Sequence, residues 1–141
     1  MDRAALDAAL ALGLPCGGWC PRGRKAEDGT IAARYPLRET PSGDYPQRTE
    51  WNVRDSEGTL VLTRGRPRGG TALTIGLTRR LGRPCLVLDL AAGPDPHELQ
   101  RWTEAEGISV LNVAGPRESQ HPGIQNDARV FLEAALRGMG V

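Results

Sequence analysis

The chain has 141 residues, enough for one domain with a hydrophobic core of its own. Its 18 Lys and Arg residues nearly balance 17 Asp and Glu residues, so the net charge of +1 argues against nonspecific binding to nucleic acid or to an anionic membrane. No apolar run approaches the ~20 residues of a membrane span, and the first residues lack the pattern of a signal peptide. We therefore expect a cytoplasmic protein with a small partner.

Helices and strands are expected to alternate along most of the chain. Apolar residues at helical spacing predict helices over 4–13, 44–55, 70–81, 95–106 and 123–136. In the third of these, Leu73, Leu77 and Leu81 form the face that we expect to be buried. Continuous apolar runs over 58–63, 84–90 and 108–113 are typical of parallel strands covered on both faces. This order predicts a single α/β domain over 1–141 with right-handed βαβ crossovers.

The segment 19–45 shows neither a helical nor an alternating pattern. It is rich in Gly, Pro, Arg and Glu and is too long to be an ordinary connection between two elements. Long loops that a compact domain retains are usually functional, so we expect this segment to border a binding site.

A glycine turn follows the first predicted strand and begins the next helix. It consists of Arg68, Gly69, Gly70 and Thr71. In parallel sheets ligands bind beyond the carboxyl ends of the strands, where a glycine turn lets backbone N–H groups and the helix dipole reach an anion. Thr71 could instead be a plain helix cap. Two successive glycines favour a site for phosphate or a similar oxyanion.

A second loop, 112–119, follows the third predicted strand at the same edge of the sheet. Its Gly115 shapes the backbone, and Arg117, Glu118 and Ser119 offer a cation, an acceptor and a hydroxyl. The two loops and the segment 19–45 should therefore meet at one crevice.

No catalytic or metal-binding set is apparent. Cys16 and Cys20 have no second pair, and His97 and His121 are far apart in the sequence, whereas a structural zinc site needs four such ligands. A flat ligand could stack on Trp19 or Trp51, although core packing is the more ordinary role for both.

Several segments together resemble a known family. They include Gly17-Gly-Trp-Cys-Pro21, Arg48-Thr-Glu-Trp-Asn-Val-Arg-Asp55, Gly69-Gly-Thr71 and Leu111-Asn-Val-Ala-Gly-Pro-Arg-Glu-Ser119. With Asp2-Arg-Ala-Ala-Leu-Asp7, these segments look like the molybdenum cofactor carrier family, across essentially the whole chain. That family is similar to the circularly permuted branch of the Rossmann-like superfamily that includes the lysine-decarboxylase-like (LOG) proteins.

The resemblance implies a Rossmann-like three-layer fold with a mostly parallel sheet. It also implies a carrier or storage role for molybdenum cofactor (molybdopterin) or a related phosphate-bearing pterin or nucleotide, and a homo-oligomer. The residues expected at the ligand come from these segments and from the two loops. They are Asp2, Arg3, Arg24, Arg48, Asn52, Gly69, Gly70, Thr71, Gly115, Arg117, Glu118 and Ser119.

The chain departs from the LOG-type phosphoribohydrolases at one point that matters for chemistry. Those enzymes have a catalytic glutamate soon after the threonine of the glycine turn, whereas Thr71 is followed here by Ala, Leu, Thr and Ile. A nucleotide or nucleoside-monophosphate hydrolase of this type, with Glu50 or Glu118 in the missing role, is the alternative to a binding protein.

The second departure concerns the start of the chain. Members of the family have a strand and a Gly-Gly-Gln-Thr-Gly turn immediately before the segment that matches Asp2 and Arg3. We therefore expect that Met1 is not the natural start and that the domain is truncated relative to the family. A slot or an unpaired strand edge is then expected beside the segment 14–18 or the strand 58–63.

Overall fold

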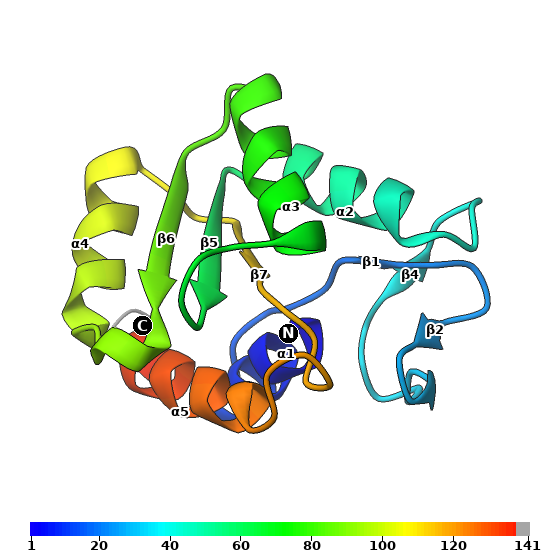
Figure 1. Ribbon diagram of the computed structural model, residues 1–141, viewed down its shortest axis with the longest axis horizontal. Coiled ribbons are helices and arrows are strands. Elements are labelled where there is room, and N and C mark those ends of the chain that lie inside the picture. Colours follow the sequence, from blue (N-terminus) through cyan, green and yellow to red (C-terminus); the bar gives the residue numbers. More distant parts are fainter. Residues whose placement is uncertain (138–141) are drawn as a thin grey trace.

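A computed structural model describes residues 1–137, apart from the side chain of Asp2. At its centre is a sheet of three parallel strands in the order β6-β5-β7 (Figure 1). The strands are β5 (Gly58–Thr63), β6 (Cys85–Asp89) and β7 (Leu111–Ala114). In register, Leu60 of β5 lies opposite Leu86 and Val113. Every residue of β5 is buried, as the continuous apolar run predicts for a central parallel strand.

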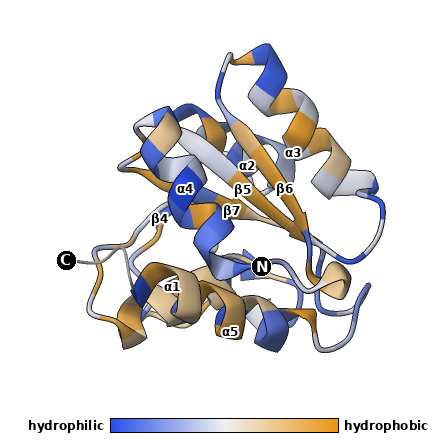
Figure 2. Cartoon of the chain, turned by 90° about the vertical axis from the view of Figure 1, so that its left-hand side faces the viewer, coloured by the Kyte–Doolittle hydropathy of each residue, from blue (hydrophilic) through white to orange (hydrophobic). Residues whose placement is uncertain are grey.

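Helices cover both faces of the sheet, which gives the predicted Rossmann-like three-layer α/β fold (Figures 1 and 2). Leu60 and Leu62 pack on one side against α1, α4 and α5. On the opposite side α3 packs against β5 and β6, and α2 packs against α3. The helices are α1 (Asp2–Ala11), α2 (Tyr45–Arg54), α3 (Gly69–Arg80), α4 (Pro96–Glu106) and α5 (Ile124–Arg137), with a short 3-10 helix η1 (Leu90–Ala92) after β6.

The buried face of α3 differs from the predicted one. Leu77 is buried as expected, but Leu73 is 49% exposed, and threonines occupy the other inward positions. Thr74 and Thr78 can lie against the sheet because each hydroxyl donates a hydrogen bond to a backbone carbonyl within the helix. Apolar periodicity alone therefore assigned the wrong rotation to the amino-terminal half of this helix.

The segment 19–45 is held together by short strands and by one arginine. Its two-residue strands are β1 (Trp19–Cys20), β2 (Lys25–Ala26), β3 (Gly29–Thr30) and β4 (Arg38–Glu39). β1 pairs with β4 in parallel, and β2 pairs with β3 in antiparallel orientation. The guanidinium of Arg24 donates hydrogen bonds of 2.8–3.2 Å to four backbone carbonyls, those of Ile31, Ala32, Tyr35 and Leu37. The segment is thus ordered around Arg24.

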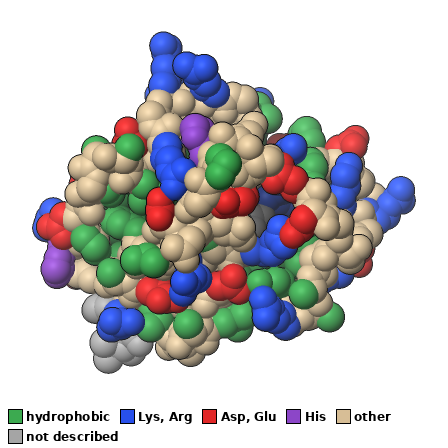
Figure 3. All heavy atoms as spheres, turned by 60° about the horizontal axis from the view of Figure 1, so that its bottom comes forward, with side chains coloured by type: hydrophobic (Ala, Val, Ile, Leu, Met, Phe, Trp, Pro, Cys, Tyr) green, Lys and Arg blue, Asp and Glu red, His purple; other side chains and the backbone are tan. Residues whose placement is uncertain are grey.

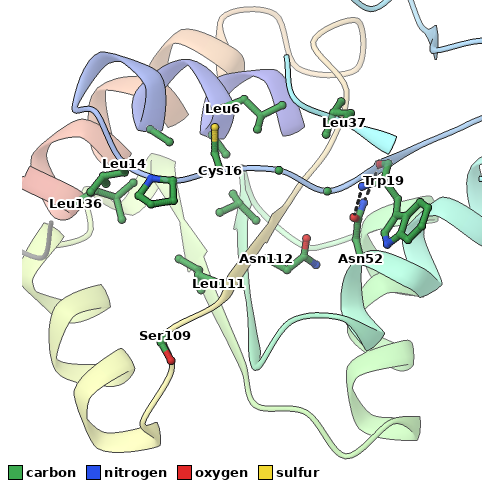
Figure 4. Close-up of a pocket in the computed structure, with 16 residues that line it drawn as sticks. Leu6, Leu14, Cys16, Trp19, Leu37, Asn52, Ser109, Leu111, Asn112 and Leu136 are labelled. Atoms are coloured by element: carbon green, nitrogen blue, oxygen red, sulfur yellow. Dashed lines mark hydrogen bonds between the residues drawn. The ribbon is translucent and has the colours of Figure 1, made fainter. Parts of the chain in front are cut away.

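A slot lies between the outer edge of β7 and the segment 14–19 (Figure 4). Its volume is about 340 Å³, and its apolar walls include Leu6, Leu14, Leu111 and Leu136. No hydrogen bond among the described residues joins β7 to 14–19, whereas β5 is paired on both edges. The expected slot is therefore present beside 14–18 and not beside the strand 58–63. An upstream strand that would fill it stays a prediction.

Charged side chains of both signs are mixed over the face that α1 and α5 form (Figure 3). None of the helices in the described part of the chain is long and apolar enough to cross a membrane.

Candidate functional site

A crevice opens at the carboxyl end of β7, beside the helix that follows β5. It lies between α2, the amino end of α3 and the loop after β7, and has a volume of about 340 Å³. Its lining includes Arg48, Gly70, Thr71, Gly115 and Arg117. Both predicted glycine loops therefore meet here, because the carboxyl ends of parallel strands lie at one edge of the sheet.

A second cavity adjoins the crevice at the start of α3, and we call it the arginine pocket. Its volume is about 480 Å³, and its lining includes Arg64, Arg66, Arg68, Gly69 and His121. The arginine pocket and the crevice share three lining residues, Thr71, Pro116 and Gln120. Together the two cavities have the size of a small-molecule site.

The described charged residues that line these two cavities are arginines. Five arginines line them, and no Asp or Glu does so among the described residues. Arg64 forms an ion pair with Asp127 and donates to the Pro122 carbonyl, whereas Arg66 and Arg68 are exposed and form no ion pair in the described part of the chain. A chain with a net charge of +1 thus concentrates positive charge at one site, which favours an anionic ligand.

The glycine turn presents open backbone to this site. Gly69 has a φ of +53°, a backbone conformation that is strained in residues with a side chain. Gly70 has no such φ, and a Cβ built there would meet no atom within 4 Å. Packing therefore does not explain the second glycine, whereas the approach of a ligand would.

The amino end of α3 has no side-chain cap. Its N-cap residue is Arg68, which makes no side-chain capping hydrogen bond. Thr71 lies within the first turn, so the alternative that it is a plain N-cap is wrong. The uncapped N–H groups at the helix start are suited to an anion.

Tyr45 is a lining residue that sequence reasoning missed. Its ring has three cations within 6 Å of the centroid, with Lys25 Nζ at 5.4 Å and the guanidinium carbons of Arg48 and Arg117 at 5.3 Å and 4.9 Å. Arg48 follows Tyr45 by three residues on α2, a spacing that places two side chains on one helix face. That spacing was the available signal, but the approach of Arg117 depends on the fold.

Two predicted ligand residues, Arg24 and Asn52, make structural hydrogen bonds, and Asn52 also lines the crevice. The four carbonyls described above occupy the guanidinium of Arg24. The Asn52 side-chain amide accepts a hydrogen bond from the N–H of Trp19 and donates one to its C=O (Figure 4). These two hydrogen bonds connect β1 to α2 beside the crevice.

Three further predicted residues lie beside the crevice and not in it. Arg3 forms a bidentate pair with Asp28 at 2.9–3.0 Å. Glu118 accepts hydrogen bonds from two backbone N–H groups at the start of α5, and these hydrogen bonds hold its pKa below the usual range. The Ser119 hydroxyl bonds Glu27. The predicted Asp2 side chain lies outside the described part of the structure.

The two carboxylates considered for hydrolysis do not reach the glycine turn. Glu50 is exposed on α2, and Glu118 is engaged at the start of α5. Neither lines the crevice or the arginine pocket. The geometry therefore supplies no carboxylate from this pair beside Gly70.

The tryptophans stack on each other outside the crevice. The rings of Trp19 and Trp51 meet edge to face with centroids 4.8 Å apart. Arg38 covers the Trp19 ring, and the Trp19 Nε1–H donates to Asp55 at 2.8 Å. An adjacent Arg54 guanidinium, aided by this hydrogen bond, lowers the pKa of Asp55 to about 2. This cluster stabilises the packing of β1 on α2.

No group of three or more His, Cys, Asp or Glu side chains that could hold a metal ion occurs in residues 1–137, Asp2 excepted. The cysteines in the described chain are all free thiols.

The fold and the site together define a class: a Rossmann-like α/β protein with a crevice at the carboxyl edge of its parallel sheet, lined by arginines and, among the described residues, by no carboxylate. The model of the circularly permutated YpsA SLOG family matches residues 1–136, and the chain belongs to this family. A crystal structure of the "putative molybdenum carrier protein" from Syntrophus aciditrophicus SB is similar, with a TM-score of 0.90 and 42% sequence identity. The match covers 96% of this chain and 87% of that one. No curated protein matches. These findings confirm the predicted family and fold.

Proposed function

We propose that this protein binds molybdenum cofactor, or a related phosphate-bearing pterin or nucleotide, as a carrier or storage protein. The observation that carries the proposal is the pair of cavities around the start of α3, which five arginines line and no Asp or Glu in the described part of the chain lines. The name of the similar crystal structure gives the proposal its particular ligand.

The residues around the crevice fit a ligand with a phosphate and a ring. The open Cβ position at Gly70 leaves room for a phosphate against the backbone, with Arg66 and Arg68 nearby in the same pair of cavities. Leu73, which is exposed at the crevice wall, and Tyr45 offer apolar surface to a ring. As cargo, molybdenum cofactor would be held here without being transformed.

The experiment is a thermal-shift and calorimetry panel of molybdate, pterin phosphates and nucleotides. A ligand at ~100 times its dissociation constant should stabilise the fold by ~2.7 kcal/mol. For a chain of this size that is a rise in Tm of roughly 8–10 °C. If none of these compounds raises Tm at excess, the proposed function is wrong.

A pair of variants links the shift to the crevice. Gly70→Leu would place a side chain in the crevice, whereas Gly76→Leu changes the same helix at an open position that lines none of the four cavities described for this chain. Both should fold, because a Cβ at either position meets no neighbour within 4 Å. We expect Gly70→Leu alone to lose the ligand-induced shift, and its retention would place the site elsewhere.

The hydrolase alternative has no support from the positions of Glu50 and Glu118. Release of a free base from a nucleoside monophosphate, followed by chromatography, would nevertheless overturn a pure carrier role. The predicted homo-oligomer stays part of the proposal, and light scattering that gives a strict monomer would remove it.

A further inference from the structure

We propose that the imidazole of His121 contacts the anionic group of the ligand in the arginine pocket, so that ligand binding is coupled to protonation of this histidine. The inference rests on the proposed function and deepens it by adding a ligand-contacting residue and a dependence of affinity on pH. None of the residues expected at the ligand from the sequence is a histidine.

The backbone of His121 holds its side chain at the arginine pocket. Its N–H donates a hydrogen bond of 3.2 Å to the Arg117 carbonyl, and its carbonyl accepts one of 3.0 Å from the Ile124 N–H at the start of α5. The half-buried side chain lines the pocket together with Arg66 and Arg68. A substitution that keeps these backbone hydrogen bonds should therefore change the pocket without changing the fold.

The ring of His121 has no structural task in the described part of the chain. It takes part in no hydrogen bond or ion pair with a described residue. A polar side chain ahead of a helix often binds the first N–H groups, but here Glu118 accepts hydrogen bonds at the start of α5. The other histidine differs, because Nδ1 of His97 lies 3.1 Å from the Asp95 carboxylate. The His121 ring is thus placed to meet a ligand.

The charged groups around His121 come from the loops after β5 and β7, from α5, from the segment 19–45 and from the start of the chain. They are Arg64, Arg66, Arg68, Arg117, Glu27, Glu118, Asp127 and the amino group of Met1. All three carboxylates are engaged, Asp127 by Arg64, Glu27 by Ser119 and Glu118 by backbone N–H groups. An anion in the arginine pocket would favour a charged imidazole, and a charged imidazole would in turn favour the anion.

The test is calorimetry on the full chain with molybdate, a pterin phosphate and 5′-AMP, each at about pH 6 and about pH 8, the range over which an imidazole titrates. For each compound that binds, the ratio of the two affinities is compared between the parent protein and His121→Gln, whose side chain is polar but cannot be protonated. We expect the affinity at the lower pH, relative to the higher, to be about fivefold greater in the parent, the effect of one charge-assisted contact. Protonation of the ligand and of the Met1 amino group affects both proteins and cancels from this comparison.

His97→Gln is the matched control, because His97 lies on α4 and lines none of the described cavities. Its ratio of affinities should equal that of the parent. The parent protein also gives an independent readout by NMR. The imidazole signals of His121 should titrate at higher pH with ligand than without it, whereas those of His97 should not move.

The same ratio in the parent and His121→Gln, an equal loss in His97→Gln, or an unchanged titration of His121 with ligand would overturn this inference and leave the proposed function standing. Binding of none of the three compounds would overturn the proposed function and this inference with it.

Discussion

Gly115 is the position where the structure makes the sharpest prediction about stability. A Cβ at this residue would lie 2.3 Å from the Leu62 carbonyl oxygen and 2.6 Å from Cε of Met1. The Met1 side chain can move, but the carbonyl belongs to the central strand β5, which is buried and paired on both edges. Gly115→Ala must therefore shift the loop after β7.

Overpacking of this kind typically lowers the free energy of unfolding by about 1–3 kcal/mol. Because the clash is with backbone that cannot move easily, we expect Gly115→Ala to lie at the upper end, about 3 kcal/mol. With a urea m-value of about 2 kcal/mol/M, the unfolding midpoint should fall by roughly 1.5 M. Gly76→Ala is the matched control, because a Cβ there meets nothing within 4 Å and the fold should gain about 0.5–1 kcal/mol. Equal midpoints for Gly115→Ala and the unchanged protein would refute the close approach of this loop to β5.

Three further predictions concern the loop, the tryptophan cluster and the slot. Arg24→Ala should lower the free energy of unfolding in urea by about 2–4 kcal/mol, because four hydrogen bonds to backbone carbonyls are lost. The segment 25–37 should then be cleaved more readily by a protease, and a variant as resistant to cleavage as the parent would contradict this. The pKa of Asp55 is lowered from 3.8 to about 2, so its contribution to stability is complete above pH 3.8 and is lost as the pH falls through about 2. The free energy of unfolding of Asp55→Asn should therefore fall less over this pH range than that of the parent protein, and an equal fall in acid titration would contradict this. Backbone amides of β7 should exchange with solvent faster than those of β5, because one edge of β7 faces the slot, and equal protection in hydrogen exchange would show that this edge is covered.

The alternation of strands and helices could be read from the sequence because it depends on local patterns. The apolar run at 58–63 became β5 with the predicted bounds, since a central parallel strand needs apolar side chains on both faces. The meeting of the turn at Gly70 with the loop at Gly115 also followed, because parallel strands end at one edge of a sheet.

Side-chain roles that depend on the rotation of an element or on distant neighbours required the tertiary structure. Leu73 faces solvent because threonines with internally bonded hydroxyls occupy the inward positions of α3. Arg24 serves four carbonyls of its own loop, and nothing in its spacing distinguishes it from an arginine that awaits a ligand. Arg117 reaches Tyr45 across 72 positions of sequence, and only the packing of α2 beside the loop after β7 brings the two together. The periodicity of the sequence indicates which side chains can be buried. Which polar side chains remain available to a ligand depends on the hydrogen bonds and ion pairs that they already make in the folded chain.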